Sequence, residues 1–351
     1  MKHLLLTLDY ELYGDGSGNV FEHIIKPTDT ILAIAEAYNA HLTIFFEVME
    51  YWRLKEQWEL GNPMGYSENP IEAMEVQLRN AYSRGHDVQL HLHPQWANAK
   101  WKGDHWEVDN AYWRLSVLSQ DEIEDLLHRG RQTLEDIIGC SQYKCDTLRA
   151  GGYNVQPSEN IVRAMRNCGF RADSSIYPGG RELGSLSRYD YTGIMPDKGM
   201  WHCGDSLETE VTESDITELP IVAFPMIRLK KYMSFDRVRA IWRNRHSATK
   251  TFAAKTSTGG GIKQHKINKL LYFFSCESQT WDYCLFSKGM HRSFLRKIRR
   301  QADRYVFVLV GHPKSFVSGS SFEYLLRLAG KEQYSFSTVS YSVQTIFHRQ
   351  E

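Results

Sequence analysis

The sequence predicts an α/β protein built on a largely parallel sheet, and three observations lead to this fold class. Short apolar runs alternate with amphipathic helical segments along most of the chain, which is typical of repeated β-α units. Polar residues suited to catalysis directly follow several of these runs. The length of 351 residues is within the range of one (β/α) barrel with inserted loops.

The alternation defines the expected elements. We expect buried strands at residues 3–9, 41–48, 86–93, 145–149, 170–174, 216–224 and 305–311. Helices are expected at residues 27–40, 70–84, 120–138, about 157–168 and 289–303. Pro27 and Thr28 open the first helix, and the third has acidic residues in its first turn and apolar residues at helical spacing.

Two segments interrupt the alternation. Residues 94–118 are rich in tryptophan and are expected to form a long loop above the strand ends. Residues 243–269 are basic around a glycine-rich stretch and are interpreted as a second inserted loop. The sequence has no evident internal repeat or domain boundary, so we expect residues 1–351 to form a single barrel domain.

The composition argues against several classes of function. Lysine plus arginine equals aspartate plus glutamate at 42 each, so net charge indicates neither a nucleic-acid nor a membrane partner. The apolar stretch Leu4–Leu8 is too short for a signal-peptide core, and no stretch approaches the roughly 20 apolar residues of a membrane span. The cysteines form no C-x-x-C pair, and no G-x-S-x-G motif of a serine hydrolase is present. We therefore expect a cytoplasmic protein with reduced cysteines.

Five polar residues fall at the C-terminal ends of predicted strands. In parallel α/β folds this edge of the sheet is where active sites are built. The clustering predicts an enzyme, and the residues concerned are Asp9, His91, Arg149, Asp173 and His312.

Two short motifs indicate a metal site. His91 and His93 are two residues apart at the end of a strand, so both imidazoles point to the same face. Asp9 and Glu11 have the same spacing after the first strand, where one carboxylate could bind a metal and the other could act as a base. The alternatives are a turn-capping Asp9, a solvated Glu11 and histidines that only make structural hydrogen bonds.

The order of the motifs resembles that of a known family. The chain reads D-x-E at 9–11, GHDVQLHLHPQW at 85–96, RAGGY at 149–153, DSS at 173–175, ELP at 218–220 and GHP at 311–313. This set resembles the polysaccharide deacetylase (NodB-homology) family, and more narrowly its branch found with bacterial surface-polysaccharide genes. The resemblance implies a distorted (β/α) barrel, usually with seven strands, and a divalent metal held by one carboxylate and two histidines.

The resemblance also implies roles for individual residues. Asp9 matches the general base, Arg149 the arginine that holds this base, and His312 the catalytic acid. A backbone N–H near Tyr153 is implied to stabilise the oxyanion. Asp173 is our candidate for the carboxylate that keeps His312 protonated.

The metal ligands include one departure from the family pattern. Glu11 matches the metal carboxylate and His91 the first metal histidine. Many members have the second histidine four residues after the first, where this chain has Gln95. His93 is the expected substitute because it shares the face of His91. A second departure is Gly151-Gly152, which replaces the x-Pro pattern of the family.

The function implied is metal-dependent hydrolysis of an N-acyl group, N-acetyl above all, on a sugar used in O-antigen or capsule biosynthesis. We expect zinc, because two imidazoles and a carboxylate suit it. A cytoplasmic location favours a nucleotide- or lipid-linked precursor as substrate, with Trp96 stacking on the sugar. The alternatives are a deformylase or other hydrolase of non-peptide C–N bonds, and a catalytically inactive barrel that binds glycan or acts as a scaffold.

Overall fold

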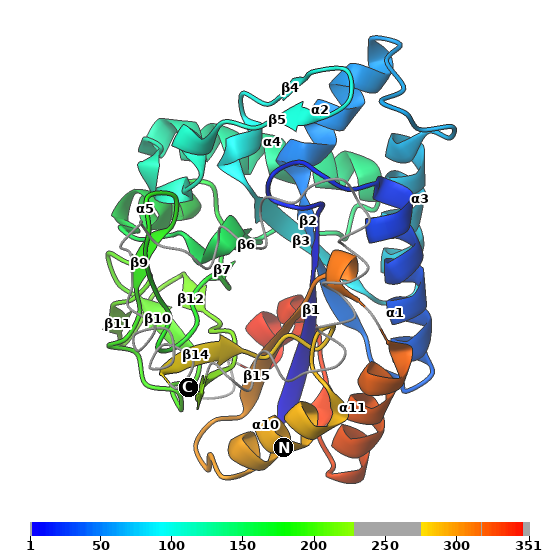
Figure 1. Cartoon of the computed structure of the whole chain (residues 1–351). Coiled ribbons are helices and arrows are strands. Elements are labelled where there is room, and N and C mark those ends of the chain that lie inside the picture. The colour runs from blue at the N-terminus through cyan, green and yellow to red at the C-terminus, as the bar shows by residue number, and fades with distance from the viewer. Residues whose placement is uncertain (1, 228–274, 317, 347–351) are drawn as a thin grey trace, which may run out of the picture.

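The computed structural model describes residues 2–227, 275–316 and 318–346. Its central sheet contains seven parallel strands, which neighbour one another in the order β12-β7-β6-β3-β2-β1-β15 (Figure 1). Their bounds are β1 (His3–Tyr10), β2 (Leu42–Glu47), β3 (Asp87–Leu92), β6 (Thr147–Ala150), β7 (Ala172–Asp173), β12 (Thr217–Glu218) and β15 (Val306–Gly311). The predicted parallel sheet is therefore confirmed.

The sheet curls until its two ends meet. Ile221, just after β12, forms a parallel bridge with Val308 of β15. The Val222 N–H also donates to the Val308 carbonyl at 2.8 Å. Three short strands extend the sheet: β10 (Trp201–Cys203) and β11 (Glu210–Val211) beside β12, and β16 (Ser335–Phe336) beside β1. This arrangement confirms the expected distorted barrel.

Helices connect the strands and cover the sheet. They are α1 (Lys26–Glu36), α2 (Val48–Glu59), α3 (Pro70–Ser83), α4 (Gln120–Ile138), α5 (Glu159–Asn167), α10 (Lys288–Arg299), α11 (Gly319–Lys331) and the short α12 (Val339–Tyr341). The bounds of α4 match the prediction because the sequence marks both of its ends. Ser119 and Glu122 form a capping box, and Gly139 ends the helix at a φ of 64°.

The tryptophan-rich insertion contains more regular structure than the predicted loop. It has a two-stranded hairpin, β4 (Lys100–Trp101) with β5 (Trp106–Glu107), and short 3₁₀ turns at Pro94–Trp96, Asn110–Tyr112 and Leu115–Val117. A second hairpin pairs β8 (Arg181–Leu183) with β9 (Arg188–Asp190), and a separate antiparallel pair joins β13 (Ala223–Ile227) to β14 (Cys276–Thr280). The expected basic insertion at 243–269 lies outside the described residues.

One expected strand and the expected absence of a membrane span can also be compared with the structure. The expected strand at 216–224 divides into β12 and the start of β13. Among the described helices, none has both the length and the apolar composition needed to cross a membrane.

Candidate active site

The parallel register brings the predicted site residues together at one edge of the sheet. Asp9 lies near the end of β1, His91 near the end of β3, and Arg149 in β6. His91 is aligned with Arg149 across the β3–β6 pair. His312 directly follows β15, which is the other neighbour of β1. Four strands therefore contribute to a single site.

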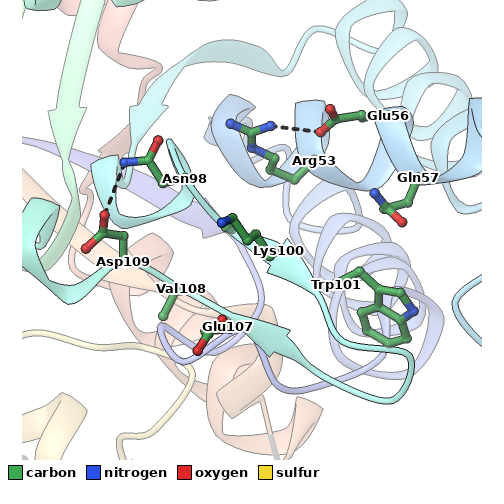
Figure 2. A pocket seen from close by; sticks show the side chains of 10 residues that line it. Arg53, Glu56, Gln57, Asn98, Lys100, Trp101, Glu107, Val108 and Asp109 are labelled. Carbon is green, nitrogen blue, oxygen red and sulfur yellow. Dashed lines mark hydrogen bonds and ion pairs between the residues drawn. The ribbon is translucent and has the colours of Figure 1, made fainter.

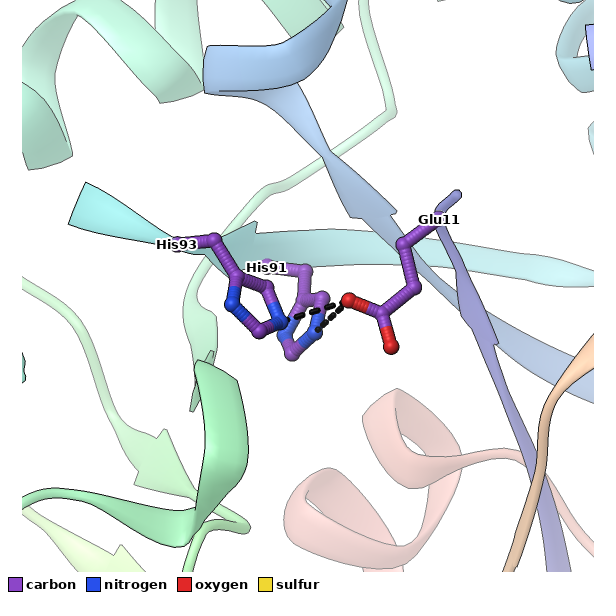
Figure 3. A group of neighbouring side chains, drawn as sticks. All are labelled: Glu11, His91 and His93. Atoms are coloured by element: carbon purple, nitrogen blue, oxygen red, sulfur yellow. Dashed lines mark ion pairs between the residues drawn. The ribbon is translucent and has the colours of Figure 1, made fainter. Parts of the chain in front are cut away.

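Glu11, His91 and His93 form a buried group with the composition of a metal site. Their ligand atoms all lie within 4.8 Å of one another. Figure 3 shows the Glu11 carboxylate at the end of β1 facing both imidazole rings. Glu11 Oε2 is 2.5 Å from His93 Nε2 and 3.5 Å from His91 Nε2.

The hydrogen bond of His91 and the burial of both rings fit a bound cation. His91 Nδ1 lies 2.8 Å from the Arg149 carbonyl oxygen, so Nδ1 is a hydrogen-bond donor and Nε2 is the ring atom left to bind a metal beside Glu11. Neither Nε2 atom has a well-directed hydrogen bond within the described residues. Burial lowers the pKa of His93 despite the nearby Glu11 carboxylate, which favours a neutral ring. Two imidazole nitrogens and a carboxylate oxygen that converge in this way fit a divalent metal such as zinc.

Lys314 holds the other oxygen of the Glu11 carboxylate. Its Nζ is 2.8 Å from Glu11 Oε1 and also donates to the Leu12 carbonyl at 2.5 Å. Burial acts to raise the pKa of Glu11, but Lys314 and then His93 outweigh it, and the pKa lies well below its usual value. Glu11 is therefore ionised, with only Oε2 directed at the two histidines.

A further buried carboxyl group supports the backbone beside Glu11. Glu50 of α2 accepts a hydrogen bond from the Leu12 N–H at 3.0 Å. Burial raises the pKa of Glu50 to about 8, so this group is mostly protonated at neutral pH. Its neighbour Glu47 begins α2 by accepting hydrogen bonds from the Met49 and Glu50 N–H groups. The start of α2 thus fixes the chain next to Glu11.

Asp9 is held by a fully buried arginine. Arg149 Nη1 donates to Asp9 Oδ1 at 2.6 Å and to Thr7 Oγ1 at 2.7 Å, and the guanidinium also donates to the Ser174 carbonyl and hydroxyl. Burial acts to raise the pKa of Asp9, but Arg149, then His91 and His312, lower it further than burial raises it. The pKa of Asp9 is therefore below its usual value, and the carboxylate is ionised and able to accept a proton.

His312 faces Asp9 and is supported by a different carboxylate. His312 Nε2 lies 3.6 Å from Asp9 Oδ2, while His312 Nδ1 lies 3.0 Å from Asp282 Oδ2. Burial acts to lower the pKa of His312, but the hydrogen bond and the charge of Asp282 more than offset it and the pKa is raised. Asp282 is itself fixed by the Cys284 N–H, which donates to its Oδ1 at 2.9 Å. The arrangement favours a protonated imidazole beside Asp9.

This geometry corrects the expectation for Asp173. Its carboxylate accepts hydrogen bonds from the Ser175 N–H at 2.8 Å and the Ser175 hydroxyl at 2.9 Å. It also shares a hydrogen bond with Glu218, and burial raises the pKa of both groups. Asp173 therefore belongs to a buried carboxyl pair between β7 and β12. The carboxylate that pairs with His312 Nδ1 is that of Asp282, which approaches β15 through the bridge to Val310.

Tyr153 occupies a backbone conformation that is rare outside glycine. Its φ is 63°, directly after Gly152 at 60°. The surrounding structure holds it there: the Tyr153 carbonyl accepts the Tyr191 hydroxyl at 2.6 Å, and its ring packs edge-on against Tyr177 at 4.8 Å. A non-glycine residue kept in the left-handed region is typical of functional sites. This turn follows β6 directly at the edge that holds Arg149.

Trp96 lies beside the site but is almost wholly buried. Only 1% of its surface is exposed, and its ring packs edge-on against Trp106 at 5.4 Å. The predicted contact between Trp96 and the substrate stays a prediction.

A polar cavity of about 910 Å³ lies between α2 and the β4–β5 hairpin (Figure 2). The residues that line it include Arg53, Glu56, Asn98, Trp101 and Asp109.

The chain was compared with known protein families, sequences and structures, and only structures resemble it. No protein-family model matches the chain, and no curated protein sequence is significantly similar to it. Among solved structures, a protein of Mycobacterium smegmatis classed as a polysaccharide deacetylase has a TM-score of 0.51 at 12% identity, covering 98% of this chain and 91% of that one. An allantoinase has a TM-score of 0.48 at 12% identity, covering 97% and 89%. A peptidoglycan N-acetylglucosamine deacetylase has 0.42 at 11% identity, covering 98% and 88%.

At these identities the similarity shows the fold alone. The predicted resemblance to polysaccharide deacetylases is confirmed at that level by the Mycobacterium smegmatis structure, whose TM-score is 0.51. The narrower surface-polysaccharide branch stays a prediction.

Three residues of the site were not singled out from the sequence. Lys314 directly follows the GHP motif at 311–313, which gives no indication of its contact with Glu11. Asp282 lies 30 residues before His312 and reaches it only through the pairing of residues 281–283 with β15. Glu50 follows a buried strand in a helix that the periodicity did not reveal. Spacing cannot report contacts that depend on sheet register.

Proposed function

We propose that this protein is a metal-dependent hydrolase that removes an N-acyl group, N-acetyl above all, from a sugar in surface-glycan biosynthesis. The observation that carries the proposal is a base and an acid placed together beside a three-ligand group. Asp9 Oδ2 is 3.6 Å from His312 Nε2, which is 4.0 Å from Glu11 Oε1. These are the groups that metal-assisted amide hydrolysis requires.

Glu11, His91 and His93 would hold the metal, for which zinc is our first choice. When bound there, the ion supplies a Lewis acid that polarises the acyl carbonyl. Lys314 keeps one oxygen of Glu11 occupied, so the carboxylate offers the other oxygen to the metal.

The remaining chemistry belongs to side chains and backbone of the chain. Asp9 accepts a proton from the attacking water, since Arg149 keeps its carboxylate ionised and fixes Oδ1. The backbone N–H near Tyr153 stabilises negative charge on the carbonyl oxygen. His312 donates its proton to the leaving nitrogen as the C–N bond breaks, and Asp282 favours the charged imidazole beforehand. Water and amide thus give a carboxylic acid and a free amino sugar.

The proposed substrate is a nucleotide- or lipid-linked sugar precursor in the cytoplasm. The cavity between α2 and the β4–β5 hairpin offers an aromatic ring, Trp101, together with amide and carboxylate groups from Asn98 and Asp109. Flat rings and side chains with several hydrogen-bonding atoms suit the apolar faces and hydroxyl groups of a sugar.

Mass spectrometry of reaction products tests the proposal. The zinc-loaded protein is incubated with matched acetamido and formamido nucleotide sugars, and we expect loss of the acyl group from an acetamido compound. Asp9→Asn should abolish the reaction, whereas Asp104→Asn, at a side chain that is 86% exposed, should not change it. Turnover of formamido compounds alone would identify a deformylase, and tight glycan binding without turnover would favour an inactive barrel.

A further inference from the structure

Gln95 has an unusual environment for an uncharged polar side chain. It stands where the resembling family has its second metal histidine, and it is fully buried. Its Nε2 lies 2.9 Å from His93 Nδ1, while its Oε1 has no hydrogen-bond partner within the described part of the chain. A buried amide oxygen without a donor is costly, so this contact needs an explanation.

The orientation of the amide determines which nitrogen of His93 can bind a metal. If the Gln95 N–H group donates to Nδ1, the proton of a neutral ring must be on Nε2, and Nε2 cannot be a ligand. A half-turn about the last side-chain bond exchanges the two terminal atoms of the amide. The oxygen then accepts a hydrogen bond from Nδ1–H, and Nε2 carries a free lone pair.

A metal bound at Nε2 requires the turned orientation. Without a metal, an Nε2–H of His93 would donate to the Glu11 carboxylate 2.5 Å away, whereas a cation between these two atoms needs the Nε2 lone pair and therefore a proton on Nδ1. The turned amide gives that Nδ1 proton an acceptor in the buried Oε1. His91 already shows the equivalent arrangement, because its Nδ1 lies 2.8 Å from the Arg149 carbonyl and its Nε2 faces Glu11. Metal-binding histidines generally have their second nitrogen fixed by an acceptor in this way.

We infer that Gln95 is a positioning residue whose side-chain oxygen accepts the Nδ1 proton of His93 and so fixes Nε2 as the metal-binding atom of that ring. The inference rests on the proposed metal site and deepens it. It explains how a chain with histidines only two residues apart retains three ligands: the residue at the family's usual ligand position supports the substitute ligand.

Gly151, the second departure from the family pattern, also makes room for the His93 imidazole. A Cβ atom at Gly151 would lie 2.3 Å from both Cε1 and Nδ1 of His93, far inside contact distance. Any other residue at this position would displace the His93 imidazole from the place it occupies beside Glu11. The Gln95 backbone is fixed as well, since its carbonyl accepts the Asp109 N–H at 2.9 Å. The two departures from the family pattern, at 95 and 151, therefore both accommodate His93.

Nitrogen NMR of the zinc-loaded protein tests the tautomer directly. The histidines are labelled with ¹⁵N, and the His93 signals are assigned by their absence in His93→Ala. We expect a protonated Nδ1 and an unprotonated Nε2 in the wild type, and loss of this preference in Gln95→Leu. A proton on Nε2 of His93 in the wild type would overturn the inference.

Zinc affinity provides a second readout that does not depend on turnover. Gln95→Leu removes the acceptor at nearly constant size, so the dissociation constant should rise about 10–100-fold. Gln95→Glu keeps an acceptor and should stay close to the wild type. The matched control is Gln132→Leu, an exposed residue of α4, which should not change the affinity. Gly151→Ala should weaken zinc binding in the same direction as Gln95→Leu.

The outcomes separate this inference from the proposed function. If the wild type binds zinc through Glu11, His91 and His93 but Gln95→Leu binds it equally well, Gln95 has no positioning role and the metal site stands. If the wild type binds no metal, or if His91→Ala binds it undiminished, the proposed site is wrong and the inference is wrong with it.

Discussion

Replacement of Arg149 by methionine tests how the proposed base is held. Arg149 is fully buried and donates four hydrogen bonds, of which the shortest, 2.6 Å, goes to Asp9. In Arg149→Met the Asp9 carboxylate, 5% exposed, keeps its place without a cation. Loss of one partner of a buried ion pair costs about 3–5 kcal/mol, so the free energy of unfolding should fall by this amount.

A double-mutant cycle separates the charge effect from lost packing. Asp9→Asn removes the buried charge, so Asp9→Asn/Arg149→Met should cost less than the sum of the single variants, with a coupling of about 0.5–3 kcal/mol. Denaturation in urea at neutral pH measures each variant. The control is Arg181→Met, whose pair with Asp190 is 57% and 41% exposed, where we expect a loss of about 1 kcal/mol or less.

Two results would refute this reasoning. One is a cost for Arg149→Met no larger than that of the exposed control. The other is strict additivity with Asp9→Asn, which would mean that the 2.6 Å contact contributes no charge interaction. If Arg149→Met does not fold, Arg149→Lys retains a cation with fewer donors and should show a smaller loss.

Three further predictions concern pH and stability. Burial lowers the pKa of His291 to about 3, so stability that is present above pH 6.5 is lost as the pH falls, by about 2 kcal/mol at pH 5. His291→Phe should lose this share of the acid dependence in denaturation curves, and an unchanged dependence would contradict the assignment. Asp282→Asn removes the group that raises the pKa of His312, so the alkaline limit of turnover should move to lower pH. A fixed limit in pH–rate profiles would mean that Asp282 does not support the acid. Ser119→Ala breaks the capping box of α4 and should cost about 1 kcal/mol in thermal or chemical unfolding, and no loss would show that the cap is not stabilising.

Much of the fold was predictable because its signals are local. The buried strands β1 and β3 and the helix α4 have apolar periodicity and end signals that do not depend on distant contacts. The helix α2 was missed because it begins at the residue after β2, without an intervening loop. Its N-cap is Glu47, which reads in sequence as the end of a strand.

The sequence predicted those site residues that belong to motifs at the ends of strands. Asp9, His91, Arg149 and His312 converge because parallel strands align their C-terminal ends, a rule that needs only the fold class. The support of His312 by Asp282 depends on a segment that joins β15 by a single bridge, which no sequence spacing encodes. The role of Gly151 depends on where one imidazole ring lies, so it too required coordinates.

The most direct test of the central claim measures bound metal and turnover together in two variants. Asp9→Asn changes the proposed base, and Glu11→Gln changes the proposed metal carboxylate 2.5 Å from His93 Nε2. We predict that Asp9→Asn retains a full equivalent of zinc but loses amide hydrolysis, whereas Glu11→Gln loses both. Near-wild-type turnover in Asp9→Asn, or undiminished zinc in Glu11→Gln, would contradict the account.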